Sequence, residues 1–336
     1  MLINRVDLDR DVLVVAEIGN NHEGDFERAK EMIGRAAEAG AQAVKFQTIV
    51  PEQLVTADQS ARLATLREFQ FSQTQFEALA KTARAAGVMF LSTPFDVGVV
   101  DWLAPLVPAF KIASGDNDYT PLLRAVAATG KPVIMSTGMA DLSETAGARD
   151  LLRSEWKRRG LPDAGIALLH CVVSYPTPPA DANLAAISAL ASLGETIGYS
   201  DHTLGIEAAT LAVAAGARII EKHFTLDKKQ SGFRDHQLSA DPAELSNLVR
   251  SIKRVQELMG ARGKHLTAAE RESLPAVRRG AYAARNLAAG SRLTAADVSY
   301  LRPRAGLSPA EIDRRFGTPL AKPAKAGEAL TAEHFS

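Results

Sequence analysis

The chain has 336 residues, of which 46% are hydrophobic and 23% charged, ordinary values for a globular protein that exclude a disordered scaffold. Its 39 basic residues balance its 39 acidic residues, so no overall positive field draws it to nucleic acid or to an anionic membrane. We therefore expect small-molecule partners that are recognised at local sites.

An alternation of strands and helices is predicted from about residue 11 to about residue 260. Short runs rich in β-branched residues are each followed by a polar cluster and an alanine-rich segment whose apolar residues recur at helical steps. Several of these helical segments end in glycine, at Gly40, Gly87, Gly130 and Gly216, as left-handed helix ends favour. The eight predicted strands are residues 12–18, 43–47, 88–93, 109–114, 132–137, 166–171, 196–200 and 218–224.

Apolar strands that are each followed by a helix are typical of a parallel sheet covered by helices. Eight such units in about 250 residues match the count and size of a (β/α)8 TIM barrel. A doubly wound open sheet is the alternative, but EIGNNHEG after the first strand matches neither a Walker A loop nor a dinucleotide-binding fingerprint. We therefore predict an α/β fold, with a TIM barrel over residues 1–260.

The composition changes after the predicted barrel. Residues 261–280 are polar and basic, and we predict a linker there. Residues 281–336 contain two short predicted strands, YAARNL and VSYLRP, and two similar phrases, AAGSRLTAADV and KAGEALTAEHF. A module this small buries a poor core by itself. We therefore expect a small β-rich domain that docks on the barrel of its own chain or of a partner.

The sequence also indicates the cellular compartment. Cys171 is the only cysteine, so neither an internal disulfide nor a cysteine-based zinc site is expected. The start, MLINRVDLDRD, carries charges of both signs, which argues against a secretory signal. No segment reaches the roughly 20 apolar residues of a membrane span. These features predict a cytoplasmic protein with no membrane partner.

Polar residues stand at the C-terminal ends of all eight predicted strands, which form the active-site mouth of a TIM barrel. A lone serine or threonine at such a place is more often an ordinary loop residue, but eight polar ends together favour a functional site. The residues are Glu17, Lys45 and Gln47, Ser92 and Thr93, Lys111 and Ser114, Ser136 and Thr137, His170 and Tyr175, Ser200 and His202, and Glu221 and His223.

Two lysines, Lys45 and Lys111, lie within apolar strand segments. A buried lysine is costly unless it is paired or meets an anion. With the hydroxyls of Ser92, Thr93 and other nearby strand ends, the two ammonium groups would form a cradle for phosphate or carboxylate. Alternatively, one lysine forms a Schiff base with substrate, as in barrel aldolases. The spacing of the residues is compatible with both hypotheses.

His202 and His223 end two consecutive predicted strands. Neighbouring strands are about 5 Å apart, so the two imidazoles can share one divalent cation and leave positions open for Lewis-acid catalysis. A histidine at a strand end is as often a hydrogen-bonded structural residue. Asp201 and Glu221 are candidates for orienting the imidazoles, or they are ordinary salt-bridge residues.

Eight motifs follow one another along the chain: AEIGNNHEGD, VKFQT, FLSTPFD, KIASGD, MSTGM, LLHCVVSYPTP, GYSDHT and EKHFT. Together they resemble the sialic acid synthase family, the phosphoenolpyruvate-condensing nonulosonic acid synthases. The tail from Tyr282, which includes LRPRAGLSP, is similar to the antifreeze-like SAF domain of these synthases. The resemblance implies an enzyme that joins phosphoenolpyruvate, water and the aldehyde of an N-acylated hexosamine into a nine-carbon α-keto acid and releases phosphate.

The resemblance also implies roles for single residues. It places a divalent ion, Mn²⁺ or Mg²⁺, on His202 and His223, and it gives catalytic roles to these histidines, to Glu17 and to Asp116. Arg302 would reach the barrel mouth of the partner subunit in a domain-swapped homodimer. The residues implied for phosphoenolpyruvate are Lys45, Thr93, Lys111, Ser114, Ser136 and Ser200. Those implied for the acceptor are Gln47, Tyr175, Asp235 and Arg302.

Two positions depart from the family pattern. Asp116 replaces a glutamate that is thought to handle the attacking water, and Val173 replaces Asn or Ser, so we leave Val173 out of the site. Two other functions are open: a Schiff-base pyruvate aldolase that uses Lys45 or Lys111, and a non-enzymatic carbohydrate-binding or assembly protein. Candidate acceptors are N-acetylmannosamine, its 6-phosphate and the diacetamido-trideoxyhexoses, which differ far from the reacting aldehyde.

Overall fold

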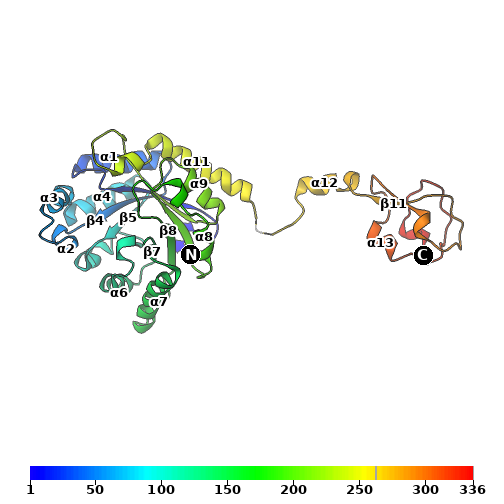
Figure 1. Cartoon of the computed structure of the whole chain (residues 1–336), viewed down its shortest axis with the longest axis horizontal. Helices are drawn as coiled ribbons and strands as arrows, with labels where there is room; N and C mark the ends of the chain where they lie inside the picture. Colours follow the sequence, from blue (N-terminus) through cyan, green and yellow to red (C-terminus); the bar gives the residue numbers. More distant parts are fainter. Residues whose placement is uncertain (262, 336) are drawn as a thin grey trace. The chain divides into compact units, whose positions relative to one another are not determined.

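The computed structural model of the chain describes residues 1–261 and 263–335. The chain divides into two compact units, Met1–Gly260 and Ala261–Ser336 (Figure 1). Within the described residues, no helix combines the length and the apolar character that crossing a membrane requires.

Eight parallel strands form the centre of the first unit. Hydrogen bonds join them in the order β5-β4-β3-β10-β9-β8-β7-β6, and β5 and β6 lie side by side at the seam of a nearly closed barrel. The expected TIM barrel is confirmed, and each strand begins and ends within two residues of its prediction. The strands are β3 (Leu13–Gly19), β4 (Ala43–Thr48), β5 (Met89–Pro94), β6 (Phe110–Ile112), β7 (Val133–Ser136), β8 (Ile166–Cys171), β9 (Thr196–Asp201) and β10 (Ile219–His223).

Helices surround these strands (Figure 1). The first of them starts after Asp25, whose side chain accepts a hydrogen bond from the Arg28 amide, and it buries one apolar face against the barrel. The four glycines expected at helix ends all have positive φ. The helices are α1 (Phe26–Glu38), α2 (Pro51–Leu54), α3 (Ser60–Phe69), α4 (Gln73–Ala85), α5 (Val100–Leu103), α6 (Thr120–Ala128), α7 (Leu142–Arg158), α8 (Ala186–Ala191), α9 (Glu207–Ala214), α10 (Asp235–Leu238) and α11 (Pro242–Met259).

A short hairpin that the sequence pattern did not indicate precedes the barrel. Its strands β1 (Leu2–Ile3) and β2 (Val6–Asp7) pair antiparallel. Ile3 and Leu8 are buried with the inward-facing residues at the beginnings of the barrel strands. The hairpin therefore packs against the end of the barrel that lies away from the predicted mouth. The barrel-strand residues of this cluster are Leu13, Val15, Ala43, Met89, Leu91, Ile134, Ala167, Leu169 and Ile219.

The second unit has its own small core around two antiparallel strands. A helix, α12, lies within the segment that was expected to be a linker. The remaining elements are short, in keeping with the small β-rich SAF domain that the sequence indicates. The elements are α12 (Ala268–Val277), β11 (Gly280–Ala283), η4 (Ala295–Asp297), β12 (Val298–Leu301), α13 (Pro309–Asp313) and η5 (Ala332–His334).

The two similar phrases of the second unit have the same local structure. Leu293 and Leu330 occupy equivalent positions in the phrases, and both are buried in the core of this unit. The following threonine in each phrase, Thr294 or Thr331, caps a 3-10 turn. The sequence repeat is therefore a structural repeat, in which a buried leucine anchors each turn.

Candidate active site

Two lysines and two carboxylates form a buried cluster towards the C-terminal ends of the barrel strands. Lys45 Nζ lies 2.8 Å from Glu17 Oε2 and 3.7 Å from Glu221 Oε2. Lys111 Nζ lies 3.8 Å from Glu221 Oε1. All four side chains are buried. The register explains their meeting, because Glu17 pairs with Lys45 on β4 and with His223 on β10, and Glu221 shares a strand face with His223.

The two carboxyl groups of this cluster have opposite pKa shifts. Burial raises the pKa of Glu17, although Lys45 opposes the rise. Burial would also raise the pKa of Glu221, but Lys111 and Lys45 outweigh it and hold this pKa at about 2. Pairs of carboxyls whose surroundings separate their pKa values in this way indicate an acid and a permanent counter-ion. Of the two carboxyls, Glu17 is therefore the more easily protonated, and Glu221 stays ionised.

The two lysines are also in different electrostatic states. Burial alone would lower the pKa of Lys45, but the carboxylates of Glu17 and Glu221 outweigh burial and raise it. Burial lowers the pKa of Lys111 and is only partly offset by Glu221. The sequence could not distinguish these lysines, because the carboxylates that separate them lie on other strands.

Hydroxyl groups complete the cluster. Lys45 Nζ donates to Thr93 Oγ1 over 3.1 Å, and Lys111 Nζ donates to Ser136 Oγ over 2.6 Å. Ser200 Oγ donates to Glu221 Oε1 over 2.9 Å. Five of the six residues predicted for phosphoenolpyruvate thus belong to one network, with Glu221 between the lysines. The sixth, Ser114, begins η2 (Ser114–Asp116) after β6, and its Oγ accepts a hydrogen bond from the Gly138 amide.

Three other strand-end residues have structural partners instead. The expected place of Ser92 in the cradle is wrong, because its hydroxyl lies 2.7 Å from Thr48 Oγ1, on the face of the sheet opposite to Thr93. Thr137 Oγ1 donates to the Leu169 carbonyl, and the ring of His170 bonds the Ala182 carbonyl. For these positions the ordinary structural interpretation holds.

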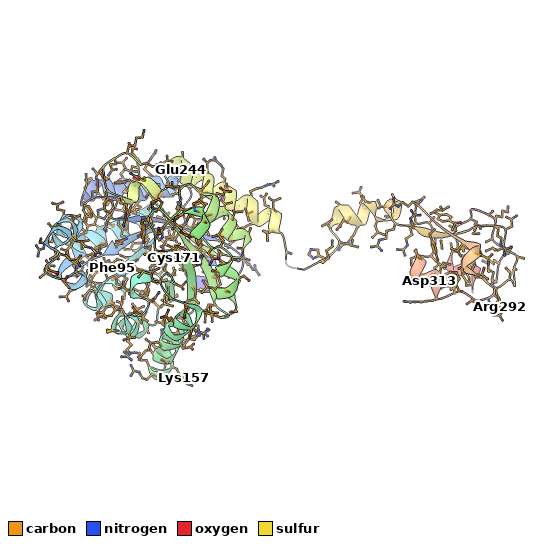
Figure 2. All side chains as sticks on the ribbon, viewed as in Figure 1. Phe95, Lys157, Cys171, Glu244, Arg292 and Asp313 are labelled. Atoms are coloured by element: carbon orange, nitrogen blue, oxygen red, sulfur yellow. The ribbon has the colours of Figure 1, made fainter. Side chains whose placement is uncertain are left out.

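The two histidines lie next to each other at this same end of the barrel. Their ring centroids are 5.4 Å apart, and the ring of Tyr175 lies 4.2 Å from that of His202. His202 Nδ1 is 2.9 Å from the Val172 carbonyl oxygen. A carbonyl oxygen can only accept, so Nδ1 carries the proton and the lone pair is on Nε2. Cys171, in the interior of the barrel unit (Figure 2), has its Sγ 3.7 Å from the same Nδ1.

The histidine pair has the chemistry of a metal site. Burial lowers the pKa of His223 to about 4, so its imidazole is neutral at pH 7, as a metal ligand must be. Its buried Nδ1 has no hydrogen-bond partner among the described residues. In residues 1–261 and 263–335, no group of three or more His, Cys, Asp or Glu side chains is arranged to hold a metal ion. An ion bound to these two imidazoles would therefore keep positions for water and substrate.

Three of the four residues predicted for the acceptor, Gln47, Tyr175 and Asp235, belong to the barrel unit. Gln47 Nε2 donates to Glu17 Oε1 over 3.1 Å. The guanidinium of Arg234 lies 4.6 Å from the centre of the Tyr175 ring, and it pairs with Asp235 at the start of α10. Arg302 follows β12 in the second unit.

Asp116 ends the turn η2 that follows β6. Its Oδ2 atom is buried, and among the residues that the structure describes it has no hydrogen-bond partner. Burial and the neighbouring Asp118 raise the pKa of the Asp116 carboxyl to about 6, although Lys111 opposes the rise. A partly buried carboxyl with a free oxygen and a pKa near neutrality has the properties of a catalytic proton acceptor.

Glu221 and Asp201 were expected either to orient the imidazoles or to form ordinary salt bridges, and the structure shows salt bridges for both. Glu221 lies between the two lysines. Asp201 pairs with Lys222 Nζ at 2.8 Å, and both side chains are fully buried. Sequence reasoning did not identify these lysine partners. A signal for this pair was present, because Asp201 and Lys222 lie opposite each other on adjacent strands, within apolar segments.

A (β/α)8 barrel with lysines, carboxylates and a histidine pair at its C-terminal strand ends defines a barrel enzyme that acts on an anionic small molecule. The comparisons with known proteins identify its family. The model of the NeuB family matches residues 32–264, and the model of the SAF domain matches residues 278–336. The chain belongs to the NeuB family and is a synthase of the sialic acid type.

Relatives with similar length support this assignment. The chain is 38% identical to N,N'-diacetyllegionaminic acid synthase of Legionella pneumophila, over 96% of this chain and 94% of the relative. It is 31% identical to pseudaminic acid synthase of Campylobacter jejuni over the whole of both chains. A crystal structure of N-acetylneuraminic acid synthetase from Leptospira borgpetersenii covers 78% of this chain and 90% of its own, with 39% identity and a TM-score of 0.73.

Proposed function

We propose that the protein condenses phosphoenolpyruvate with the open-chain aldehyde of an N-acylated hexosamine and with water. The products are a nine-carbon α-keto acid and inorganic phosphate. The observation that carries this proposal is the buried cluster of Lys45, Glu17, Glu221 and Lys111 next to the imidazoles of His202 and His223. This arrangement offers cations for an enol phosphate beside two imidazoles for an ion that polarises a sugar carbonyl.

Phosphoenolpyruvate is an anion, so its binding requires a net positive charge in the cluster. The cluster can gain this charge by taking up a proton. While both carboxyls are ionised, Glu17 and Glu221 balance Lys45 and Lys111. An incoming phosphate would raise the already elevated pKa of Glu17 further, since like charges disfavour ionisation. Substrate binding is therefore coupled to protonation of Glu17. The hydroxyls of Thr93 and Ser136, already bonded to the lysines, would then donate to the bound anion.

The protonated Glu17 is placed to serve the carbon–carbon bond-forming step. The enol carbon attacks the aldehyde carbon, and the proton on Glu17 passes to the aldehyde oxygen. The carbon that carries the phosphate becomes electron-deficient, and water adds to it. Asp116 accepts a proton from this water, which a pKa of about 6 allows at neutral pH. The carbon–oxygen bond to phosphate then breaks while the proton of the new hydroxyl passes to the departing phosphate, which releases inorganic phosphate and leaves the keto group.

We propose that His202 and His223 hold a divalent cation, Mn²⁺ or Mg²⁺. Two observations support this: the His202 Nδ1 contact with the Val172 carbonyl, which directs the lone pair to Nε2, and the unpartnered Nδ1 of neutral His223. A bound cation would act as a Lewis acid on the acceptor carbonyl. Tyr175 packs against His202 and limits the ways in which the imidazole can turn.

The test is release of inorganic phosphate from phosphoenolpyruvate in the presence of a panel of N-acylated hexosamines. We expect release with at least one acceptor, a product mass equal to the sum of the acceptor and pyruvate, and loss of turnover after chelation that Mn²⁺ restores. The His202→Ala variant should lose about 100-fold or more in turnover with unchanged tryptophan fluorescence. Absence of phosphate release with every acceptor, or full activity of the variant, would contradict the proposal.

We further propose that residues 261–280 connect a catalytic domain at residues 1–260 with a SAF domain at residues 281–336 in a domain-swapped homodimer. Arg302 of one subunit would then contact the acceptor in the barrel of the other. The small core of the second unit supports this proposal, because such a module gains stability by docking.

A further inference from the structure

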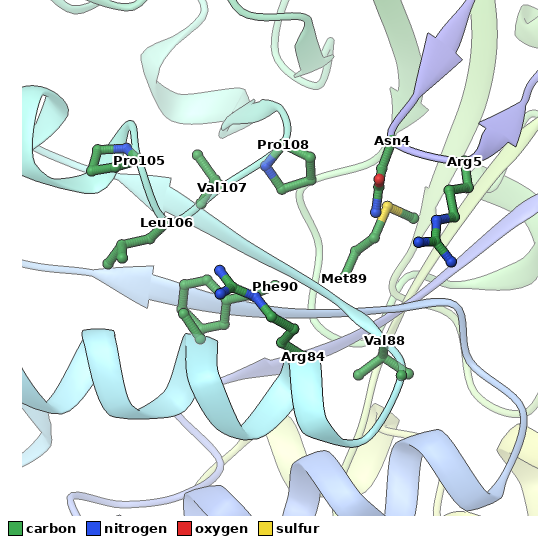
Figure 3. Close-up of a pocket in the computed structure, with 12 residues that line it drawn as sticks. Asn4, Arg5, Arg84, Val88, Met89, Phe90, Pro105, Leu106, Val107 and Pro108 are labelled. Atoms are coloured by element: carbon green, nitrogen blue, oxygen red, sulfur yellow. The ribbon is translucent and has the colours of Figure 1, made fainter.

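A cavity lies in the barrel unit beside the N-terminal hairpin and the beginning of β5 (Figure 3), so it is at the end of the barrel opposite to the lysines and histidines. Its volume is about 510 Å³, which falls within the range of small-molecule sites, roughly 300–1,000 Å³. Three segments meet around it: the turn of the N-terminal hairpin, the end of α4 with the start of β5, and residues 105–108, which lead into β6. The cavity therefore backs onto the seam between β5 and β6, where the described strands form no ladder.

One wall of this cavity is apolar. Its apolar lining comes from Val88, Met89 and Phe90, where the chain enters β5, and from residues 105–108 (Figure 3). Val88 and Phe90 belong to the core cluster between strands and helices, and Met89 belongs to the cluster inside the barrel. Of the wall residues, Val88, Met89, Phe90 and Val107 are buried, so the wall is fixed by the barrel core. A rigid apolar wall of this kind suits a ring of carbon atoms.

The rest of the lining carries positive charge without compensation. Arg5, on the hairpin turn, and Arg84, in the last turn of α4, flank the apolar wall (Figure 3). The 12 lining residues include no Asp and no Glu. Neither guanidinium forms an ion pair or a hydrogen bond with any residue in the described part of the chain.

This lack of partners is unusual within the barrel unit. The other arginines of residues 1–260, from Arg10 to Arg254, hold carboxylates, amides or carbonyls, with the single exception of Arg218 in the ranges that the structure describes. Two of the three unpartnered arginines of the barrel unit thus line one cavity. A guanidinium is a rigid fork of donors that matches a carboxylate or phosphate.

We propose that this cavity binds a small organic anion, in which a carboxylate or phosphate is attached to an apolar ring. The guanidinium groups of Arg5 and Arg84 supply the positive charge that attracts the anionic group, and the ring packs on the apolar part of the lining, at the start of β5 or at residues 105–108. The site is separate from the predicted catalytic mouth, so it does not depend on the proposed reaction.

Phenyl phosphate and benzoate are suitable probes, since they combine a ring with each kind of anionic group. Calorimetric titration of the full chain should give saturable binding of at least one of them, about tenfold tighter than that of inorganic phosphate or benzyl alcohol alone. Arg5→Gln and Arg84→Gln should each weaken this binding about tenfold. Arg218→Gln, which removes an unpartnered arginine outside the cavity, should leave it unchanged.

Each titration is repeated with excess phosphoenolpyruvate, because the lysines of the mouth could also attract a phosphate ester. Binding at the cavity persists under this competition and stays sensitive to Arg5 and Arg84. Three results would each overturn the proposal: no binding of either probe up to about 10 mM, equal binding of the ring-free anion, or binding that the two arginine variants leave intact. The arginine variants should also keep wild-type phosphate release, so a failure of this site is distinguishable from a failure of the proposed reaction.

Discussion

The buried lysines show how far single residues can be interpreted from sequence. The apolar residues on either side of Lys45 and Lys111 correctly indicated that both lysine side chains are buried and need partners. It could not reveal that Glu17 holds Lys45 at 2.8 Å, or that Glu221 faces both lysines. Those contacts join residues of different strands, and a single sequence does not show which side chains of different strands lie close together. The sequence therefore left Glu221 open between a partner of histidine and a salt-bridge residue, and it did not identify the lysines as its partners.

We expect the Asp116 carboxyl to control how the reaction rate depends on pH. Its pKa of about 6 means that the carboxyl is mostly ionised at pH 7 and gains a proton as the pH falls through 6. If the ionised form accepts a proton from water, kcat should fall on the acid side with an apparent pKa near 6. Asp116→Asn should lower kcat by about 100-fold or more and remove this acid limb. The measurement is kcat for phosphate release between pH 5 and 8.

The conservative variant separates catalysis from structure. Asp116→Glu keeps the carboxylate and places the residue type that the family pattern carries, so it should retain an acid limb and most of the activity. Asp118→Asn removes the neighbouring charge, and it should move the limb to lower pH, because Asp118 raises the pKa of Asp116. An unchanged acid limb in Asp116→Asn would show that another group titrates.

The hydrophobic pattern of the sequence predicted the barrel strands but not the N-terminal hairpin. The eight barrel strands are apolar runs of sufficient length to be recognised, and each is followed by a helix. The strands of the hairpin, Leu2–Ile3 and Val6–Asp7, have two residues each, too few for an alternation to be visible. Their burial is decided by tertiary packing of Ile3 and Leu8 inside the barrel. The helix α12 was hidden for a different reason, because it contains Pro275 and none of its residues is buried.

The buried ion pair of Asp201 and Lys222 joins the ends of β9 and β10. We expect this pair to contribute to the stability of the barrel. Lys222 Nζ contacts Asp201 Oδ2 at 2.8 Å and also the Thr203 carbonyl. Lys222→Met leaves the Asp201 carboxylate buried without its partner, so the free energy of unfolding should fall by about 3–5 kcal/mol. Urea unfolding followed by tryptophan fluorescence measures this, because Trp102 and Trp156, the only tryptophans, both lie in the barrel unit.

A double variant tests whether charge is the cause. Asp201→Asn together with Lys222→Met removes both charges, so it should recover part of the stability that Lys222→Met loses. The His202 and His223 side chains follow these two residues directly, so Mn²⁺ affinity, measured by electron paramagnetic resonance, should weaken in the single variant. A loss in the double variant equal to the sum of the two single losses would show that the pair is not coupled.

For the whole molecule, the sequence indicated two parts with different composition, and the structure divides after Gly260. The barrel has a large core between its strands and helices, whereas the second unit buries only a small cluster that includes Leu293, Ile312 and Leu330. The role of Arg302 depends on a partner subunit, which is a property of the assembly. No pattern within one chain determines whether its SAF domain serves its own barrel or that of a second copy.

Subunit complementation distinguishes these two arrangements. Lys111→Met inactivates the barrel, and Arg302→Ala inactivates the contribution of the second unit. In a domain-swapped heterodimer of the two variants, one site combines an intact barrel with an intact Arg302, so purified heterodimers should have about half of the wild-type activity. If each Arg302 served its own barrel, both sites would carry one defect and no activity would return. Two affinity tags purify the heterodimer, and phosphate release with the active acceptor measures recovery against both variant homodimers. Full activity of the Arg302→Ala homodimer would itself contradict the role of this residue.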